Sequence, residues 1–540
     1  MTGIRVAAVQ FAVGSDVDAN LATCVRMVNA AAARGAHLIV LPAYCNHPVE
    51  YDDRAHAERV ACRLGDAFLE TLSALAAEHE AYLKVHVTLA VEERLTAANL
   101  LYGPDGTLLA RADAHALSES EREWLDPVPG PGPVVDTPIG RFGLVTGADA
   151  ARAGVPRALA VAGAEVLLVS MDSVTTDDTR LHVPVRAAEN KVWIVAANVI
   201  GSRPGASALG VPEDWLAGVG ESAAFGADGA PVARAPRRAE TVVIADIEPG
   251  WAADKTRPDG GDIFLARRPR LYAARRPPGP RPPAAASTRV AVMRPDGHGM
   301  SAIEDAGRRV RAAAADGVEL IVLPELFHYA DGRADGSFLD GIAVDVIAQS
   351  LDGTACHAVT TLPDDAAHVG VLISARGVSG RQVQMHPCAR HVGWQAALGD
   401  RLVPMDLSWG RLVIMVGDDA LYPEMFDLAA RLGADAVAVP CAPAERWELT
   451  LGLPARTAEC GLNIVASAHP GPGGGGLILT PVADPVLHAG RSGGFDGTLA
   501  EPAVARVPAG VPVVTGVIHP ERARRQVPES AVAARSHLPL

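Results

Sequence analysis

Glu325 is the residue of this 540-residue chain that most directly suggests chemistry. It follows the apolar run Leu-Ile-Val-Leu-Pro at 320–324, which is typical of a buried strand. A carboxylate at the end of such a strand is costly unless it is hydrogen-bonded or used. The same five residues occur at 38–42, where the next residue is Ala43. Because folding does not require a carboxylate at this point, the sequence favours a function for Glu325.

Several other blocks also occur twice. Gly147 lies in Ile-Gly-Arg-Phe-Gly-Leu-Val-Thr-Gly-Ala-Asp-Ala, and Gly417 lies 270 positions later in Trp-Gly-Arg-Leu-Val-Ile-Met-Val-Gly-Asp-Asp-Ala. The same offset relates Arg-Ala-Ala-Glu at 186–189 to Arg-Thr-Ala-Glu at 456–459. A constant offset between matching blocks predicts one domain that is present twice.

These blocks resemble the nitrilase (carbon-nitrogen hydrolase) superfamily over nearly the whole chain. Members have a Glu after a Leu-Pro strand end, a Lys two residues before a His, and a Cys after a strand that begins with Gly-Arg. The helix-like stretch Arg-Ala-Ala-Glu-Asn at 186–190 also matches the family closely. The resemblance implies an α/β fold with two αββα sandwich domains that form an intrachain pseudo-dimer, αββα-αββα, with further homo-oligomers as an open alternative.

The resemblance also implies a catalytic triad, and both halves depart from it. In the family a Cys thiolate attacks a nitrile or amide carbon, a Glu moves the proton, and a Lys stabilises the oxyanion. At these three positions the first half has Ala43, Asp113 and Gly147, and the second half has Glu325, Gln384 and Gly417. Neither half has the nucleophile or the Lys, so we predict that the thioester reaction is lost in both.

In the second half, the family template places other polar groups around Glu325. His386 and Asp418 would join it in a set capable of acid–base chemistry without a covalent intermediate, and Cys441 and Phe327 would line the pocket. The alternative is that His386, like His115 in the first half, is a buried framework histidine. A metal site built from Glu325, His386 and Asp418 has no recognised spacing, so neither a metal nor another cofactor is predicted.

Three cysteines are candidates for a replacement nucleophile: Cys45, Cys388 and Cys441. For each of them the favoured explanation is a small buried apolar residue, and Cys441 is the candidate to test first. The seven cysteines are scattered and include no Cys-x-x-Cys pair, which favours reduced thiols in a cytoplasmic protein. Glu119, Glu121 and Glu123 are typical of a solvated helix face, although one of them could match an additional pocket Glu of the family.

Composition limits the classes of partner. The formal net charge of −15 argues against nucleic acid and anionic membranes, and no apolar run approaches the roughly 18 residues that span a bilayer. A stretch rich in Pro and Arg divides the chain into an expected first domain at 1–276, a linker at 277–287 and a second domain at 288–540. Strands are predicted at 4–11, 37–41, 166–171, 193–197, 290–293, 437–440 and 464–468, and helices at 20–34 and 302–315.

Two functions remain open from the sequence. One is a repurposed, non-covalent enzyme that acts on a small nitrogen-containing or carbonyl substrate through the second-half pocket, with the first half as a structural partner. The other is a catalytically inactive pseudoenzyme that binds a ligand or acts as a scaffold. The retained Glu325 favours the first, and a small-molecule ligand is expected.

Overall fold

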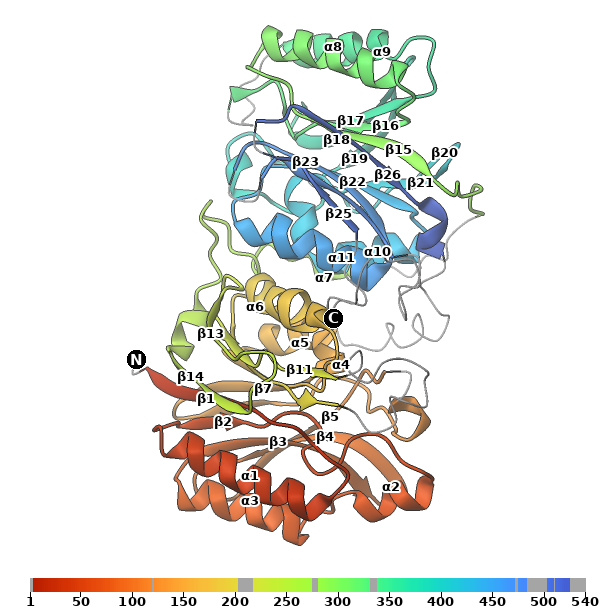
Figure 1. Ribbon diagram of the computed structural model, residues 1–540. Coiled ribbons are helices and arrows are strands. Elements are labelled where there is room, and N and C mark those ends of the chain that lie inside the picture. Colours follow the sequence, from red (N-terminus) through yellow and green to blue (C-terminus); the bar gives the residue numbers. More distant parts are fainter. Residues whose placement is uncertain are drawn as a thin grey trace. The chain divides into compact units, whose positions relative to one another are not determined.

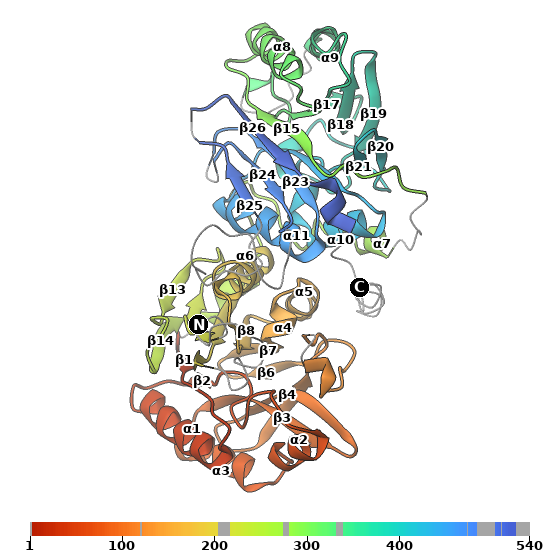
Figure 2. The ribbon, with the colours of Figure 1, turned by 45° about the vertical axis from the view of Figure 1, so that its right-hand side comes forward.

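The computed structural model describes residues 3–118, 121–202, 217–273, 280–330, 338–471, 474–482, 503–508 and 510–524. These residues form two compact units, and the chain passes from the first to the second between Lys255 and Thr256. Residues 256–273, expected in the first domain, are therefore grouped with the second unit. Figures 1 and 2 show the elements of both units.

The first unit contains two six-stranded sheets, with strand orders β14-β1-β2-β3-β4-β5 and β13-β12-β9-β8-β7-β6. Strands β1, β2 and β3 are parallel, as are β7, β8 and β9, so loops that follow these strands begin along one edge of each sheet. The bounds in the first sheet are β1 Ile4–Gln10, β2 Leu38–Val40, β3 Tyr82–Val91, β4 Arg94–Tyr102, β5 Leu108–Asp113 and β14 Thr241–Ile247. Those in the second are β6 Val134–Thr137, β7 Gly140–Thr146, β8 Val166–Ser170, β9 Trp193–Ala197, β12 Ala223–Phe225 and β13 Pro231–Arg234, and a separate pair consists of β10 Ile200–Gly201 and β11 Gly218–Val219.

Helices cover the outer face of each sheet in the first unit. Helices α1 (Val17–Ala32) and α3 (Ala67–Glu78) pack on the first sheet, and α5 (Gly154–Val161) and α6 (Val183–Asn190) pack on the second, giving four αββα layers (Figure 1). Helix α1 begins at Asp16, whose carboxylate accepts the N–H groups of Asp18 and Ala19. The shorter elements are α2 Arg54–Val60, α4 Gly147–Ala150, η1 Glu121–Glu123, η2 Asp178–His182 and η5 Pro249–Ala253.

The second unit has sheets with the corresponding strand orders, β26-β15-β16-β17-β18-β19 and β25-β24-β23-β22-β21-β20. The bounds are β15 Thr288–Met293, β16 Leu320–Val322, β17 His357–Asp364, β18 Ala367–Ser374, β19 Gly377–Val383 and β26 Val513–Ile518 in one sheet. In the other they are β20 Met405–Leu407, β21 Gly410–Ile414, β22 Ala436–Cys441, β23 Asn463–Ala468, β24 Gly476–Thr480 and β25 Ala503–Arg506. Its helical elements are α7 Pro269–Tyr272, α8 Met300–Ala315, α9 Leu339–Ser350, α10 Pro423–Arg431, α11 Leu453–Cys460, η7 Ala389–His391, η8 Gly417–Leu421, η9 Glu448–Gly452 and η10 Pro520–Arg524.

Alternating apolar residues explain the layers of this unit. Val290, Val292, Leu320 and Val322 face the second sheet, while Ala291 and Ile321 face α8 and α9. Every strand and helix predicted above is confirmed, with bounds that differ by three residues at most. Among the described residues, no helix is long and apolar enough to cross a membrane.

Candidate functional site

In the second unit, the three positions expected to carry the triad meet at the strand ends. Glu325 follows β16, Gln384 follows β19 and Gly417 follows β21. A Cβ atom on Gly417 would lie 2.6 Å from Glu325 Oε2 and 3.5 Å from Gln384 Nε2. The three positions therefore lie together as the family template requires, but Gly417 has no side chain and cannot supply a thiolate.

Two arginines occupy the space around Glu325. Arg390 Nη2 lies 2.9 Å from Glu325 Oε1, and Arg390 Nη1 lies 3.0 Å from Asp418 Oδ1 and 3.2 Å from Asp259 Oδ2. Arg257 Nη1 lies 2.9 Å from Asp418 Oδ2, and Arg257 Nη2 lies 2.9 Å from Glu448 Oε1. We call Arg257, Asp259, Glu325, Arg390, Asp418 and Glu448 the arginine cluster. The cavity beside it, next to Gly417 and Cys441, measures only about 20 Å³, which is room for about one water molecule.

The arginine cluster controls the charges of its acids. Burial opposes ionisation of Glu325, but Arg390, His391 and His368 together outweigh it, so the pKa of Glu325 is lowered. Burial likewise opposes ionisation of Asp418, and Arg257 and Arg390 together hold the pKa of this carboxyl well below its ordinary value. For Glu448 burial prevails over Arg257 and raises the pKa to about 7. Glu325 and Asp418 are thus fixed as anions, which makes them poor general acids near neutral pH.

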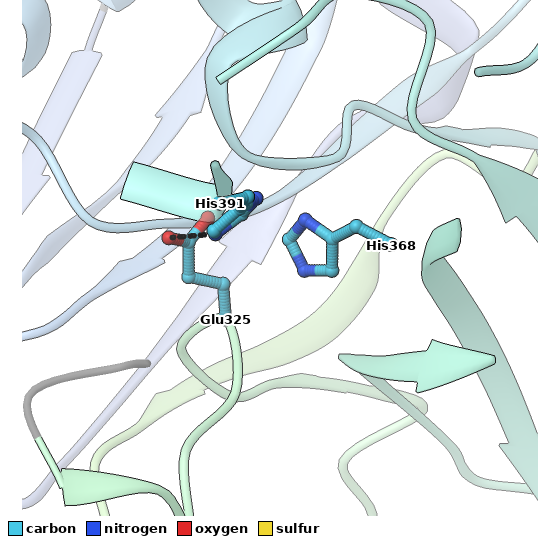
Figure 3. A group of neighbouring side chains, drawn as sticks. All are labelled: Glu325, His368 and His391. Atoms are coloured by element: carbon cyan, nitrogen blue, oxygen red, sulfur yellow. Dashed lines mark ion pairs between the residues drawn. The ribbon is translucent and has the colours of Figure 1, made fainter. Parts of the chain in front are cut away.

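Figure 3 shows two histidines beside Glu325, namely His368 and His391. One ligand atom from each of the three residues lies within 4.8 Å of the others, and all three side chains are buried. Both His368 nitrogens have partners, Gln384 Oε1 at 2.8 Å and Thr361 Oγ1 at 2.6 Å, and burial lowers the pKa of His368 to about 4. Since Arg390 already neutralises Glu325, this arrangement favours a guanidinium-paired carboxylate over a metal centre.

The other residues expected at this site lie elsewhere or are fully bonded. His386 Nδ1 lies 2.8 Å from Asp419 Oδ1, its Nε2 lies 2.7 Å from the Tyr272 hydroxyl, and its ring stacks on Tyr422, so it is a framework histidine. Phe327 packs in the core beneath α8 and α9 and does not line the cavity. Cys441 does line it, but burial raises the pKa of its thiol, as it does for Cys388. Such thiols are poor nucleophiles.

In the first unit the expected Lys position is off by one residue. The Ala114 N–H donates to Ala97 O just as the Gln384 N–H donates to His368 O. The register of strands β2 to β5 matches that of β16 to β19, and this match aligns the same two residues. Ala114, and not Asp113, therefore corresponds to Gln384. Because a shift of one residue reverses the face of a strand, Asp113 instead pairs with Arg111. His115 accepts the Gly130 N–H and is a framework residue too.

The truncated positions of the first unit border a real cavity. It measures about 290 Å³, close to the lower end of known ligand pockets, and both Ala43 and Gly147 line it. A Cβ atom on Gly147 would meet only Met171, at 3.4 to 3.6 Å. The lining of the cavity is mixed, and the residues with polar side chains in it are Tyr44, His86, Ser118, Glu121, Thr146, Ser170, Asp172, Ser173, Thr175 and Asp178.

Glu121 is a pocket residue and not part of a solvated helix face. It is 8% exposed, accepts the Ser118 N–H at 2.6 Å and contacts the Tyr44 hydroxyl. Glu119 lies outside the described residues, and the side chain of Glu123 is exposed. Glu121 is therefore the additional pocket carboxylate that was expected among the three glutamates. The interpretation as a solvated helix face was wrong for this residue.

Two residues that the sequence interpretation missed lie on β3. Lys84 is fully buried, its Nζ contacts Ser170 Oγ and lies 3.5 Å from Val145 O, and burial lowers its pKa well below the ordinary value. His86 is 1% exposed, and its Nδ1 accepts the Tyr44 N–H at 3.0 Å. A sequence signal did exist, because Lys84-Val85-His86 is a Lys-x-His pattern on a different strand from the expected one. Arg257 and Arg390 had no such signal, since their partners are distant in the chain.

Comparison with known proteins finds a family model, a sequence relative and several solved structures that resemble part of this chain. A family model described as "Carbon-nitrogen hydrolase" matches residues 5–255. A protein named "Nitrilase" from Pyrococcus abyssi is 24% identical over 256 residues, which is 47% of this chain and 93% of that protein. Among solved structures, an amidase from Nesterenkonia sp. is 23% identical, with a TM-score of 0.41, 46% of this chain covered and 92% of that one. The C. elegans NitFhit protein is 21% identical, with a TM-score of 0.43 and coverages of 50% and 66%. The likeness to carbon-nitrogen hydrolases is thus shown for residues 5–255, and the sequence relative matches a stretch of similar length.

Proposed function

We propose that this chain binds a small nitrogen-containing molecule without covalent chemistry, in the cavity of its first unit. The observation that carries this proposal is the cavity of about 290 Å³ at Gly147, against about 20 Å³ at Gly417. The matching strand orders support a duplicated domain, of which one copy keeps an open pocket. This reverses the preference for the second half that Glu325 suggested from the sequence.

The residues at the triad positions support the loss of the thioester reaction. Ala43, Ala114 and Gly147 offer no nucleophile, base or oxyanion donor from their side chains. In the second unit Glu325 is paired with Arg390, and Gly417 again offers no nucleophile. The pseudoenzyme function therefore has the better support, and the nitrogen-containing ligand is suggested by the family match and by the relative named nitrilase.

The experiment is a binding screen that includes a variant with a filled cavity. Small amides, nitriles and amines are tested by thermal shift and calorimetry against the full chain and against Gly147→Leu, whose added side chain extends from a position with ordinary contacts. Gly341→Leu is the matched control, because a Cβ atom on that exposed helical glycine would meet nothing within 4 Å. We expect binding that survives in Gly341→Leu and is lost in Gly147→Leu. Binding that is equal in both variants, or absent throughout, would contradict the proposal.

A second candidate function is the non-covalent enzyme centred on Glu325. Its specific support is a group of buried polar atoms that make no hydrogen bond among the described residues: Glu325 Oε2, Gln384 Nε2 and both ring nitrogens of His391, of which Nε2 lies 3.8 Å from Glu325 Oε1. Unsatisfied buried groups are rare and often functional. This function requires Glu325→Gln to abolish a measured activity while Gly147→Leu leaves it intact, which is the opposite pattern from the first proposal.

A further inference from the structure

Three carboxylates share the cavity of the first unit. Glu121, Asp172 and Asp178 all line it, and none of its described lining residues is a Lys or an Arg. Burial raises the pKa of Glu121 and of Asp178, and the charge of Asp172 raises both further. Hydrogen bonds from Tyr44 and Ser118 to Glu121 act in the opposite direction, as do His182 and a Ser173 hydrogen bond at Asp178, but the net shift of both pKa values is upward. Mutual repulsion of this kind is relieved by a positive charge placed between the acids.

The second unit shows how one of these carboxylates can be satisfied. Asp178 begins the π-helical turn η2, and Glu448 begins the corresponding turn η9. The guanidinium of Arg257 lies 2.9 Å from Glu448 Oε1 and also binds Asp418, so in that unit the chain itself supplies the cation. Among the described residues that line the first cavity no Lys or Arg takes this place, and a ligand would supply the positive charge there.

His86 adds a hydrogen-bond donor to the same cavity. Its Nδ1 accepts a backbone N–H, which can only donate, so the proton of the neutral ring is on Nε2. Nε2 is buried and has no acceptor among the described residues, although the ring lines the cavity. A buried N–H without an acceptor is costly, and a ligand oxygen would satisfy it.

We propose that this cavity binds a small organic cation, an ammonium or guanidinium group held by Glu121 and Asp178, on a molecule whose oxygen accepts from His86 Nε2. The inference rests on the proposed function and specifies its ligand class. It predicts selectivity for charge, which a merely polar cavity would not have.

The test is isothermal titration of the full chain with three related probes. The cation 4-aminobutanamide, its uncharged analogue pentanamide and the anion succinamate have similar sizes and each carry an amide oxygen. We expect the cation to bind at least about tenfold more tightly than pentanamide, and succinamate to bind most weakly. Asp178→Asn and Glu121→Gln should each weaken binding of the cation by about tenfold, whereas Asp136→Asn, on an exposed side chain, should not.

A pH titration of the unmodified chain provides a second measurement if a variant fails to fold. The raised pKa values of Glu121 and Asp178 mean that these acids take up protons at a higher pH than ordinary carboxyls, so binding of the cation should weaken as the pH falls, beginning above the range in which ordinary carboxyls titrate. Equal binding of pentanamide, tighter binding of succinamate, no effect of Asp178→Asn, or no binding of any probe would overturn the inference. If pentanamide or succinamate binds and Gly147→Leu prevents it, the proposed function stands and only the ligand class is wrong.

Discussion

Substituting alanine for either glycine of the lost nucleophile positions should have opposite effects in the two units. Gly417 has a φ angle of +52°, in the left-handed region that favours glycine, and an added Cβ atom would lie 2.6 Å from Glu325 Oε2. Gly147 lies outside that region, and its added Cβ atom would make ordinary contacts with Met171. The same chemical change therefore tests two environments.

The expected magnitudes follow from these geometries. An alanine in the left-handed region costs about 1–2 kcal/mol. At Gly417, Glu325 must also move away, and disturbing its buried pair with Arg390 should cost a further 1–3 kcal/mol or so, less than the roughly 3–5 kcal/mol for breaking such a pair. Gly147→Ala should instead stabilise the first unit by about 0.4–1 kcal/mol, because alanine restricts the unfolded chain.

Calorimetry measures the change in Tm of each variant, and peptide-resolved hydrogen exchange shows in which unit the change occurs. For a domain of this size about 1 kcal/mol shifts the Tm by roughly 2–4 °C, so Gly417→Ala should lower the Tm of the second unit by about 5–15 °C. Faster exchange should be confined to peptides of that unit, and Gly147→Ala should leave its own unit unchanged or slightly more protected. An unchanged Tm in Gly417→Ala, or an equal loss in Gly147→Ala, would refute the reasoning.

Three further outcomes are expected. Lys84→Met should raise the Tm near neutral pH and flatten the rise of the Tm between about pH 7 and pH 9. The pKa of Lys84 is lowered in the folded chain, so the unfolded chain binds the extra proton and the free energy of unfolding falls by up to about 1.4 kcal/mol per pH unit on acidification. A variant that is less stable at pH 7 would count against this. Glu325→Gln should cost about 1–3 kcal/mol in urea unfolding, since Arg390 keeps two of its three carboxylates, and an unchanged midpoint would show that the pair contributes nothing. Hydrolysis of simple nitriles, aliphatic amides or N-carbamoyl compounds, followed by ammonia release, should be absent; turnover that is lost on Cys441→Ala would identify a displaced nucleophile.

The sequence was a good guide to the layers and a poorer one to the pockets. Alternating and continuous apolar runs located the strands because burial alone determines them. The Lys position was misplaced because matching His115 with His386 by residue type ignored the strand pairing, which makes Ala114 the counterpart of Gln384. The prediction that the halves pack as a pseudo-dimer stays a prediction.

Which pocket is open could not have been predicted from single positions. Glu325 suggested a working site, but the two arginines that occupy its surroundings lie far from it in the sequence, at Arg257 and Arg390. In the first unit, Ala43, Asp113 and Gly147 at the expected triad positions suggested only loss. The cavity beside Ala43 and Gly147 is visible only in the structure, where Glu121 and Asp178 also line it.

The burial of every cysteine gives the chain its own set of reporters for local opening. All seven are buried free thiols, three in the first unit and four in the second. Burial raises the pKa of Cys356 to about 12 and that of Cys62 higher still, so an alkylating reagent finds almost no thiolate while the fold is closed. The rate of labelling at each thiol should therefore follow how often its surroundings open. Cys45 directly follows Tyr44, which lines the open cavity of the first unit, and Cys441 lines the small cavity of the second. Their labelling rates would therefore compare how often the two pockets open, without any engineered probe.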